Sequence, residues 1–320
     1  MIGVAFLRAF LPASAVAAVL TSLLVSLSCQ EAVSSPSGAS IQTTGKAAPK
    51  GDALAPVVEI QKEDYAQARG RFRTKLLRKG PSPQPWKPVK PPAGVTEVEY
   101  PSGDLRLKAW VNRPAEANRR HPAVLFLHGG FAFGLEDWTI SQPFRDASFV
   151  VLTPMLRAEN GQPGAFTFFY EEVDDVLAAA EFLSKQTYVD ANRLYVAGSS
   201  AGGTLSLLAA QASKCFRAAA SYSASPDQAL LVRHAKIDLP FDKTNPRELQ
   251  LRSPLAYAAS FKCPVRIYYA TRDHFVLTSQ KTAEVAKGRG LDVEAVRIEG
   301  DHGSIVPVGI KQSIPFFQGK

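Results

Sequence analysis

The chain has 320 residues and a hydrophobic content of 46%, enough for one large α/β core with additional segments. Its formal net charge is +8, but residues 61–90 carry +7 of this charge, from nine Lys and Arg against two acidic residues. The remainder is nearly neutral at +1, which excludes nucleic-acid binding through a broad basic face.

The N-terminus has the pattern of an export signal. An almost continuously apolar or small stretch, residues 10–25, follows Arg8 and ends close to Cys29. We expect residues 1–29 to be a bacterial signal peptide, with lipidation at Cys29 as a hypothesis, although Ser26 stands where a lipoprotein signal usually has leucine. A plain cleaved signal and an uncleaved anchor are the alternatives. The expected location is the periplasm or cell envelope, with a membrane tether if Cys29 is acylated.

Two segments of unusual composition precede the folded domain. Residues 30–56 are mostly small and polar without periodicity, which predicts a flexible linker. Residues 57–94 have apolar positions near helical spacing as far as Lys79, and then a proline-rich link. They predict a solvated basic helix docked by one apolar edge, in preference to a membrane-binding helix.

From residue 95 to residue 320 the pattern is that of a folded α/β domain. Residues 95–100 and 105–111 alternate apolar and polar, which predicts an antiparallel hairpin. The later strands are expected at 123–127, 149–153, 194–197, 218–221, 265–270 and 293–298, and the helices at 171–185, 278–288 and 307–318. This alternation predicts a doubly wound, mostly parallel sheet. Residues 225–261 form a long excursion, which predicts a lid or a wall of the substrate pocket.

The stretch from Leu194 to Gly203 reads LYVAGSSAGG and fits G-x-S-x-G around Ser200. A buried strand precedes the motif and a small-residue helix follows it. Strand, sharp turn and helix together are typical of a nucleophile elbow, where flanking glycines leave the serine hydroxyl clear of the sheet. The pattern predicts Ser200 as a catalytic nucleophile.

A serine hydroxyl needs a base that removes its proton during attack. Among five histidines, His302 directly follows the last predicted strand, at a position from which a loop residue can reach the elbow. We therefore expect His302 to be the base. Surface or structural positions are expected for the other four, which are His121, His128, His234 and His274.

The base in turn needs a carboxylate that orients it. Asp273, just after the strand predicted at 265–270, is the preferred candidate. Asp227, which follows the preceding strand, is the alternative. Asp301 is adjacent to His302 in sequence and is less able to orient it.

Acyl transfer also requires hydrogen-bond donors for the oxyanion of the tetrahedral intermediate. The amide of Ala201, immediately after the nucleophile, is the first expected donor. The second is expected in the turn formed by Gly129, Gly130 and Phe131, where missing side chains allow the backbone to approach the substrate.

Five stretches of the chain carry a resemblance to a known family: 126–131 (FLHGGF), 173–176 (VDDV), 188–194 (YVDANRL), 198–203 (GSSAGG) and 300–303 (GDHG). From about residue 95 to residue 317 the chain resembles an α/β-hydrolase, and most of all the catalytic domain of the prolyl oligopeptidase family of serine peptidases. The order Ser200, Asp273, His302 is the order in that fold. The resemblance implies hydrolysis of small ester or peptide substrates through an acyl-serine, with no metal or organic cofactor.

Two departures leave the substrate open. Large members of the family carry a β-propeller, for which we expect no room in this chain, and Ser199 stands where many of these peptidases have His, Trp or Gly. A carboxylesterase is therefore an alternative, as is an exported binding protein that has lost catalysis. We expect residues 225–261, Phe131 and Phe133 to shape the substrate site. The oligomeric state is not predicted.

The remaining cysteines suggest a disulfide. Cys215 and Cys263 each stand just before a predicted strand, and in an α/β-hydrolase sheet these strands are parallel neighbours, about 5 Å apart. In an exported chain an even pair favours a bond between them. Two free, buried thiols are the competing interpretation.

Overall fold

A computed structural model describes residues 54–114, 116, 118–235 and 237–320. The predicted signal peptide, the lipidation site Cys29 and nearly all of the predicted linker lie outside the described residues. Within them, no helix combines the length and the apolar character that a membrane crossing requires.

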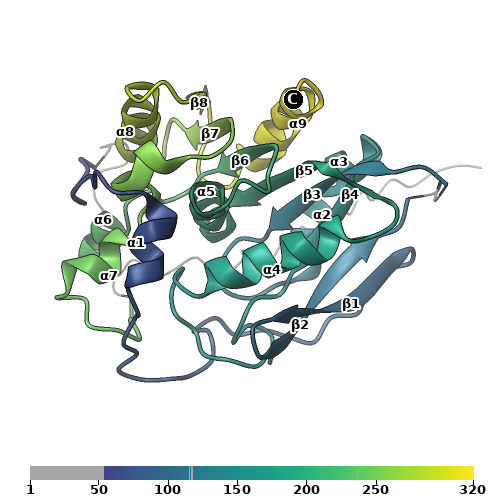
Figure 1. Ribbon diagram of the computed structural model, residues 1–320, viewed down its shortest axis with the longest axis horizontal. Helices are drawn as coiled ribbons and strands as arrows, with labels where there is room; N and C mark the ends of the chain where they lie inside the picture. The colour runs from purple at the N-terminus through teal and green to yellow at the C-terminus, as the bar shows by residue number, and fades with distance from the viewer. Residues whose placement is uncertain (1–53, 115, 117, 236) are drawn as a thin grey trace, which may run out of the picture. The chain divides into compact units, whose positions relative to one another are not determined.

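An eight-stranded sheet, in the order β1-β2-β4-β3-β5-β6-β7-β8, forms the centre of the described chain (Figure 1). The β1–β2 and β2–β4 pairs are antiparallel, and every other neighbouring pair is parallel. The strands are β1 (Val95–Ser102), β2 (Leu105–Asn112), β3 (His121–Leu127), β4 (Val150–Pro154), β5 (Val189–Ser199), β6 (Ala218–Tyr222), β7 (Val265–Ala270) and β8 (Val293–Ile298). The predicted hairpin and mostly parallel α/β-hydrolase sheet are confirmed.

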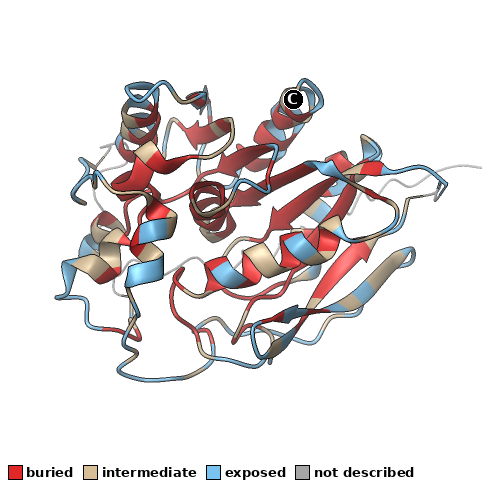
Figure 2. Ribbon diagram, in the orientation of Figure 1, coloured by how far each residue is buried: buried red, intermediate tan, exposed pale blue. Residues whose placement is uncertain are grey.

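Helices pack on both faces of this sheet, and side chains of the strands contribute to an apolar core on each side. Alternate residues of β3 point to opposite faces, so that Leu125 and Leu127 belong to one core and Val124 and Phe126 to the other. Figure 2 shows the central strands as buried. The helices are α1 (Tyr65–Arg71), α2 (Leu135–Ile140), α3 (Gln142–Asp146), α4 (Glu172–Ser184), α5 (Ala201–Ala212), α6 (Gln228–His234), α7 (Pro246–Gln250), the 3-10 helix η1 (Pro254–Ser260), α8 (Val276–Lys287) and α9 (Val306–Gln318).

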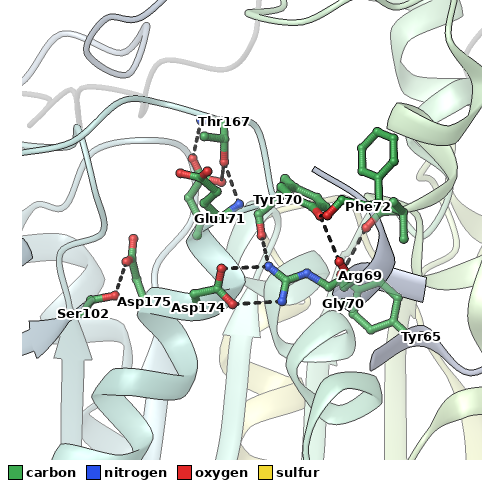
Figure 3. A network of polar contacts seen from close by, with 12 residues as sticks. Tyr65, Arg69, Gly70, Phe72, Ser102, Thr167, Tyr170, Glu171, Asp174 and Asp175 are labelled. Atoms are coloured by element: carbon green, nitrogen blue, oxygen red, sulfur yellow. Dashed lines mark hydrogen bonds and ion pairs between the residues drawn. The ribbon is translucent and has the colours of Figure 1, made fainter. Parts of the chain in front are cut away.

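The basic segment before the sheet contains a helix shorter than predicted, because α1 ends at Arg71. Its buried edge is formed by Tyr65 and Ala68. Figure 3 shows a polar anchor beside this edge, where Arg69 donates two hydrogen bonds to Asp174 of α4, at 2.9 and 3.0 Å. Arg69 also donates to the carbonyl of Tyr170 at 2.7 Å. The segment is therefore fixed to α4 by an ion pair and to the core by apolar contacts.

The excursion at residues 225–261 is folded and closely packed, and it contains α6, α7 and η1. The N-terminal segment lies against it, since the Tyr65 amide donates to Ser260 Oγ at 3.0 Å and the Leu77 amide to the Pro240 carbonyl at 2.7 Å. Inside it, fully buried Arg252 forms an ion pair with Glu248 at 2.6 Å. These contacts tie the described part of the excursion to the N-terminal segment, and its role as a lid or a wall of the substrate pocket stays a prediction.

Cys215 and Cys263 are both free thiols, so the predicted disulfide is wrong. The strands after them, β6 and β7, are parallel neighbours as expected, and Ala219 pairs with Val265. Cys215 is exposed, whereas burial raises the pKa of Cys263 to about 12 and keeps it a thiol.

Candidate active site

Ser200 stands at the tip of a tight turn between β5 and α5. Its backbone has φ 52° and ψ −114°, a conformation that L-residues rarely adopt. The turn is held because the Ser200 amide donates to the Tyr222 carbonyl at the end of β6, at 2.8 Å. Glycine is required at position 202, since a Cβ there would overlap the carbonyl oxygens of Leu127 and His128. The strained turn presents the hydroxyl at the carboxyl end of the sheet.

Two loops at that same end bring His302 and Asp273 to Ser200. His302 Nε2 lies 2.9 Å from Ser200 Oγ, and His302 Nδ1 lies 2.7 Å from Asp273 Oδ2. Asp273 follows β7 and its side chain is only 5% exposed, whereas the His302 side chain, after β8, is 45% exposed. Ser223 supports the histidine loop by donating its hydroxyl to the His302 carbonyl at 2.7 Å. The three residues singled out in the sequence thus form one hydrogen-bonded chain.

The charge of His302 depends on its partner. Burial alone lowers the pKa of His302, but the hydrogen bond and negative charge of Asp273 outweigh it and raise the pKa above the ordinary value. Because the carboxylate of Asp273 accepts from Nδ1–H, the neutral ring has its lone pair on Nε2. This tautomer can accept the proton of the Ser200 hydroxyl.

The other carboxylates considered as orienting acids have different partners. Asp227 is fully buried and accepts from the amides of Val57, Val58 and Leu230, at 2.6, 2.9 and 3.0 Å. It caps α6 and binds the N-terminal segment. Asp301 is exposed and accepts from the Ser304 amide at 3.0 Å. Neither carboxylate bonds to His302.

The four residues from which the two oxyanion donors were expected differ in what their amides already bind. The amides of Gly130 and Ala201 have no hydrogen-bond acceptor among the described residues. The Phe131 amide, by contrast, donates to the side-chain oxygen of Gln84 at 2.8 Å and is not the free donor of the turn. The Gly129 amide forms a hydrogen bond with the buried Asp137 carboxyl. Burial raises the pKa of Asp137, and this hydrogen bond lowers it in part. Gly130 and Ala201 are left as the available pair.

A buried ion pair lies beneath this turn. His128 Nε2 is 3.0 Å from Glu159 Oε2, and His128 Nδ1 is 3.0 Å from the Gly129 carbonyl. Since both partners are oxygens that accept, both ring nitrogens must donate, which requires an imidazolium. Burial alone lowers the pKa of His128, but Glu159 raises it to about 9, in agreement with this geometry. His128 is therefore structural, as expected.

The other histidines that were expected outside the site are bound or placed elsewhere. The His121 ring bonds to the Glu116 carbonyl at 2.8 Å. His234 ends α6 and His274 follows Asp273, both on the surface.

The expectation that Phe131 and Phe133 shape the substrate site stays a prediction, and Phe131 lines a small cavity beside Gly130 and Phe166. Both side chains are buried, Phe131 against Phe166 with ring centroids 5.0 Å apart, and Phe133 against Trp110 at 4.8 Å. Their apolar character serves the core. The sequence analysis also missed Gln84, which binds the Phe131 amide. Gln84 lies in a proline-rich link, and no local motif predicts this contact.

Comparison with known proteins agrees with this geometry. The sequence model described as the prolyl oligopeptidase family matches residues 140–304, more than half of the chain. A curated relative, the uncharacterized peptidase YtmA of Bacillus subtilis, is 25% identical over 206 residues, covering 59% of this chain and 79% of that protein.

Solved structures of similar fold include peptidases and esterases. The acylaminoacyl peptidase of Pyrococcus horikoshii superposes with a TM-score of 0.58 at 22% identity, over 70% of this chain. An esterase of Pyrobaculum calidifontis superposes with a TM-score of 0.59 at 20% identity, over 72% of this chain and 86% of its own. The present chain spans only 40% of the length of the acylaminoacyl peptidase.

Proposed function

The chain belongs to the prolyl oligopeptidase family and is a serine hydrolase, and we propose that Ser200, His302 and Asp273 carry out its reaction on small acyl substrates. The observation that carries the proposal is the continuous hydrogen-bonded chain from Ser200 through His302 to Asp273. The turn of residues 129–131 packs against Ser200, and the amides of Gly130 and Ala201 have no acceptor among the described residues. A catalytically inactive binding protein would not need to maintain both features together.

The proposed reaction has two half-reactions. Ser200 Oγ attacks the acyl carbon as its proton passes to His302 Nε2, and the carbonyl electron pair moves onto the oxygen. The amides of Gly130 and Ala201 donate to that oxyanion, and each such donor is worth about 10²–10³ in kcat. His302 then gives the proton to the leaving group as its bond breaks. Water repeats the sequence on the acyl-serine and releases the acid.

We place the substrates among short acylated amides and esters. The peptidase reaction is supported by family membership and by the similarity to YtmA. The carboxylesterase reaction is a second candidate, because this chain superposes on most of an esterase chain but on 40% of the acylaminoacyl peptidase. The His302 side chain is half-exposed, which supports access by leaving groups of both kinds.

A kinetic panel distinguishes the two. We expect measurable kcat/KM both for p-nitrophenyl acyl esters and for N-acylated aminoacyl p-nitroanilides, with all activity lost in Ser200→Ala. Faster turnover of proline-containing amides than of any ester would exclude the esterase candidate. A complete lack of turnover on both series, by folded protein, would contradict the proposed function itself.

The activity should depend on pH through His302. The raised pKa of His302 means that its inactive, protonated form persists to higher pH, so kcat/KM should fall as the pH drops through that pKa, above about 6.5. Replacing Asp273 with asparagine removes the charge that raises the pKa, and the acid limb should then move to lower pH. The pH profiles of kcat/KM for both proteins test this, and coincident acid limbs would contradict it.

A further inference from the structure

The turn that carries the proposed oxyanion donor is bound by residues 80–86, here called the strap, which lie before β1 in the sequence. Gln84 Oε1 accepts the Phe131 amide at 2.8 Å, and Ser82 Oγ donates to the Phe131 carbonyl at 2.5 Å. Both backbone polar groups of Phe131 are therefore held by the strap. These two contacts cross sequence separations of 47 and 49 residues.

The strap is itself fixed at several points. The Ser82 amide donates to the Ala158 carbonyl at 3.0 Å, and the Phe166 amide donates to the Gly80 carbonyl at 3.0 Å. Upstream, Arg69 anchors α1 to Asp174, as Figure 3 shows. The strap is thus held in place by hydrogen bonds to other parts of the domain, and through Ser82 and Gln84 it can in turn hold the turn in one conformation.

The hydrogen bond between Gln84 and the Phe131 amide lies next to Gly130, whose amide is the proposed oxyanion donor. Gly130 has φ 65°, and a Cβ at this position would overlap Gln84 Oε1, so the Gln84 amide packs against the bare backbone of Gly130. A Cβ at Gly129, the preceding residue, would lie 3.8 Å from the Ser200 Cβ, which places this turn against the nucleophile. Fixing the peptide that joins Gly130 to Phe131 restricts the rotation of a glycine that could otherwise adopt several conformations.

We propose that Gln84 is a positioning residue that orients the oxyanion hole. By accepting the Phe131 amide, it holds the turn with the Gly130 amide unpaired and directed to the oxygen of the tetrahedral intermediate. It touches neither substrate nor Ser200, and it acts through Phe131 and Gly130. This inference rests on the proposed function, because an oxyanion hole has meaning only for acyl transfer at Ser200.

The test compares full-length protein with Gln84→Ala and Gln84→Met, the latter keeping the volume but not the acceptor oxygen. Gln67→Ala is the matched control, an exposed glutamine of α1 in the same N-terminal segment. The substrates are p-nitrophenyl acetate and p-nitrophenyl hexanoate, and rates are normalised to sites titrated with a fluorophosphonate, so that unfolded protein does not count. Inhibition by a trifluoromethyl ketone, whose serine adduct carries an oxyanion, is measured in parallel.

We expect both Gln84 variants to lower kcat about ten-fold for both esters, less than the loss of a donor itself, with KM changed by less than about two-fold. The trifluoromethyl ketone should bind more weakly by the same factor as kcat/KM falls. Gln67→Ala should match the unmodified protein.

Four results would overturn the inference. Unchanged kcat would show that the turn keeps its geometry without Gln84, and increased kcat would show that the side chain blocks the site. A loss that depends on acyl length would place Gln84 in the acyl pocket, and full activity of Gln84→Met would reduce its role to filling space. Ser200→Ala, compared at equal total protein, separates these results from failure of the proposed function. Turnover by Ser200→Ala, or no turnover by the unmodified protein, would mean that the proposed function itself has failed.

Discussion

Replacing Ser200 with alanine is expected to lower kcat on p-nitrophenyl esters by about 10⁶-fold, while the circular dichroism spectrum and melting temperature stay close to those of the unmodified protein. The reaction loses its nucleophile, whereas the turn keeps its backbone bond to Tyr222. Steady-state kinetics and thermal melting on the same samples give both quantities.

Loss of the base should cost nearly as much as loss of the nucleophile, because the members of such a triad act as a unit. His302→Ala is therefore expected to approach the residual activity of Ser200→Ala. Ser184→Ala, at the end of α4, is the matched serine control and should be fully active. Substantial activity in His302→Ala would show that another group is the base.

Asp273→Asn is expected to lower kcat by about 10⁴-fold with little change in the fold. An asparagine amide facing Nδ1 favours the tautomer that places the proton on Nε2, where it cannot accept from Ser200. The change also removes the negative charge that stabilises the imidazolium formed during attack.

Asp227→Asn provides the contrast for this prediction. Its carboxylate binds three backbone amides and makes no hydrogen bond to His302, so the variant should keep kcat and lose about 1–2 kcal/mol of stability. Kinetics and urea denaturation of the two variants test the assignment. A larger loss of kcat in Asp227→Asn than in Asp273→Asn would reverse it.

Most of the sheet could be predicted from the sequence because its strands are short apolar runs between turns. The strands expected at 265–270 and 293–298 have those same bounds in the structure. The failures came where long-range packing decides the outcome. Cys215 and Cys263 precede the neighbouring strands β6 and β7 as expected, but their thiols are free, which a position next to a strand in sequence does not decide.

The proposed site follows the same division. Ser200, Asp273 and His302 could be selected because each follows a predicted strand, and parallel strands end at one edge of the sheet. The sequence did not show which residue of the turn 129–131 has a free amide, because the Phe131 amide binds Gln84, 47 residues away in the chain. Gln84 lies in a link whose prolines predict only an extended spacer. No periodicity or motif in the sequence predicts a hydrogen bond between residues this far apart in the chain.

The central claim, that Ser200 is an activated nucleophile, is tested most directly by intact-mass and peptide-mapping analysis after exposure to a fluorophosphonate. We expect one phosphonyl adduct per chain, on Ser200, formed with loss of fluoride, slowed when His302 is protonated and absent in Ser200→Ala. Folded protein that stays unlabelled, or that carries the adduct on another residue, would contradict the account.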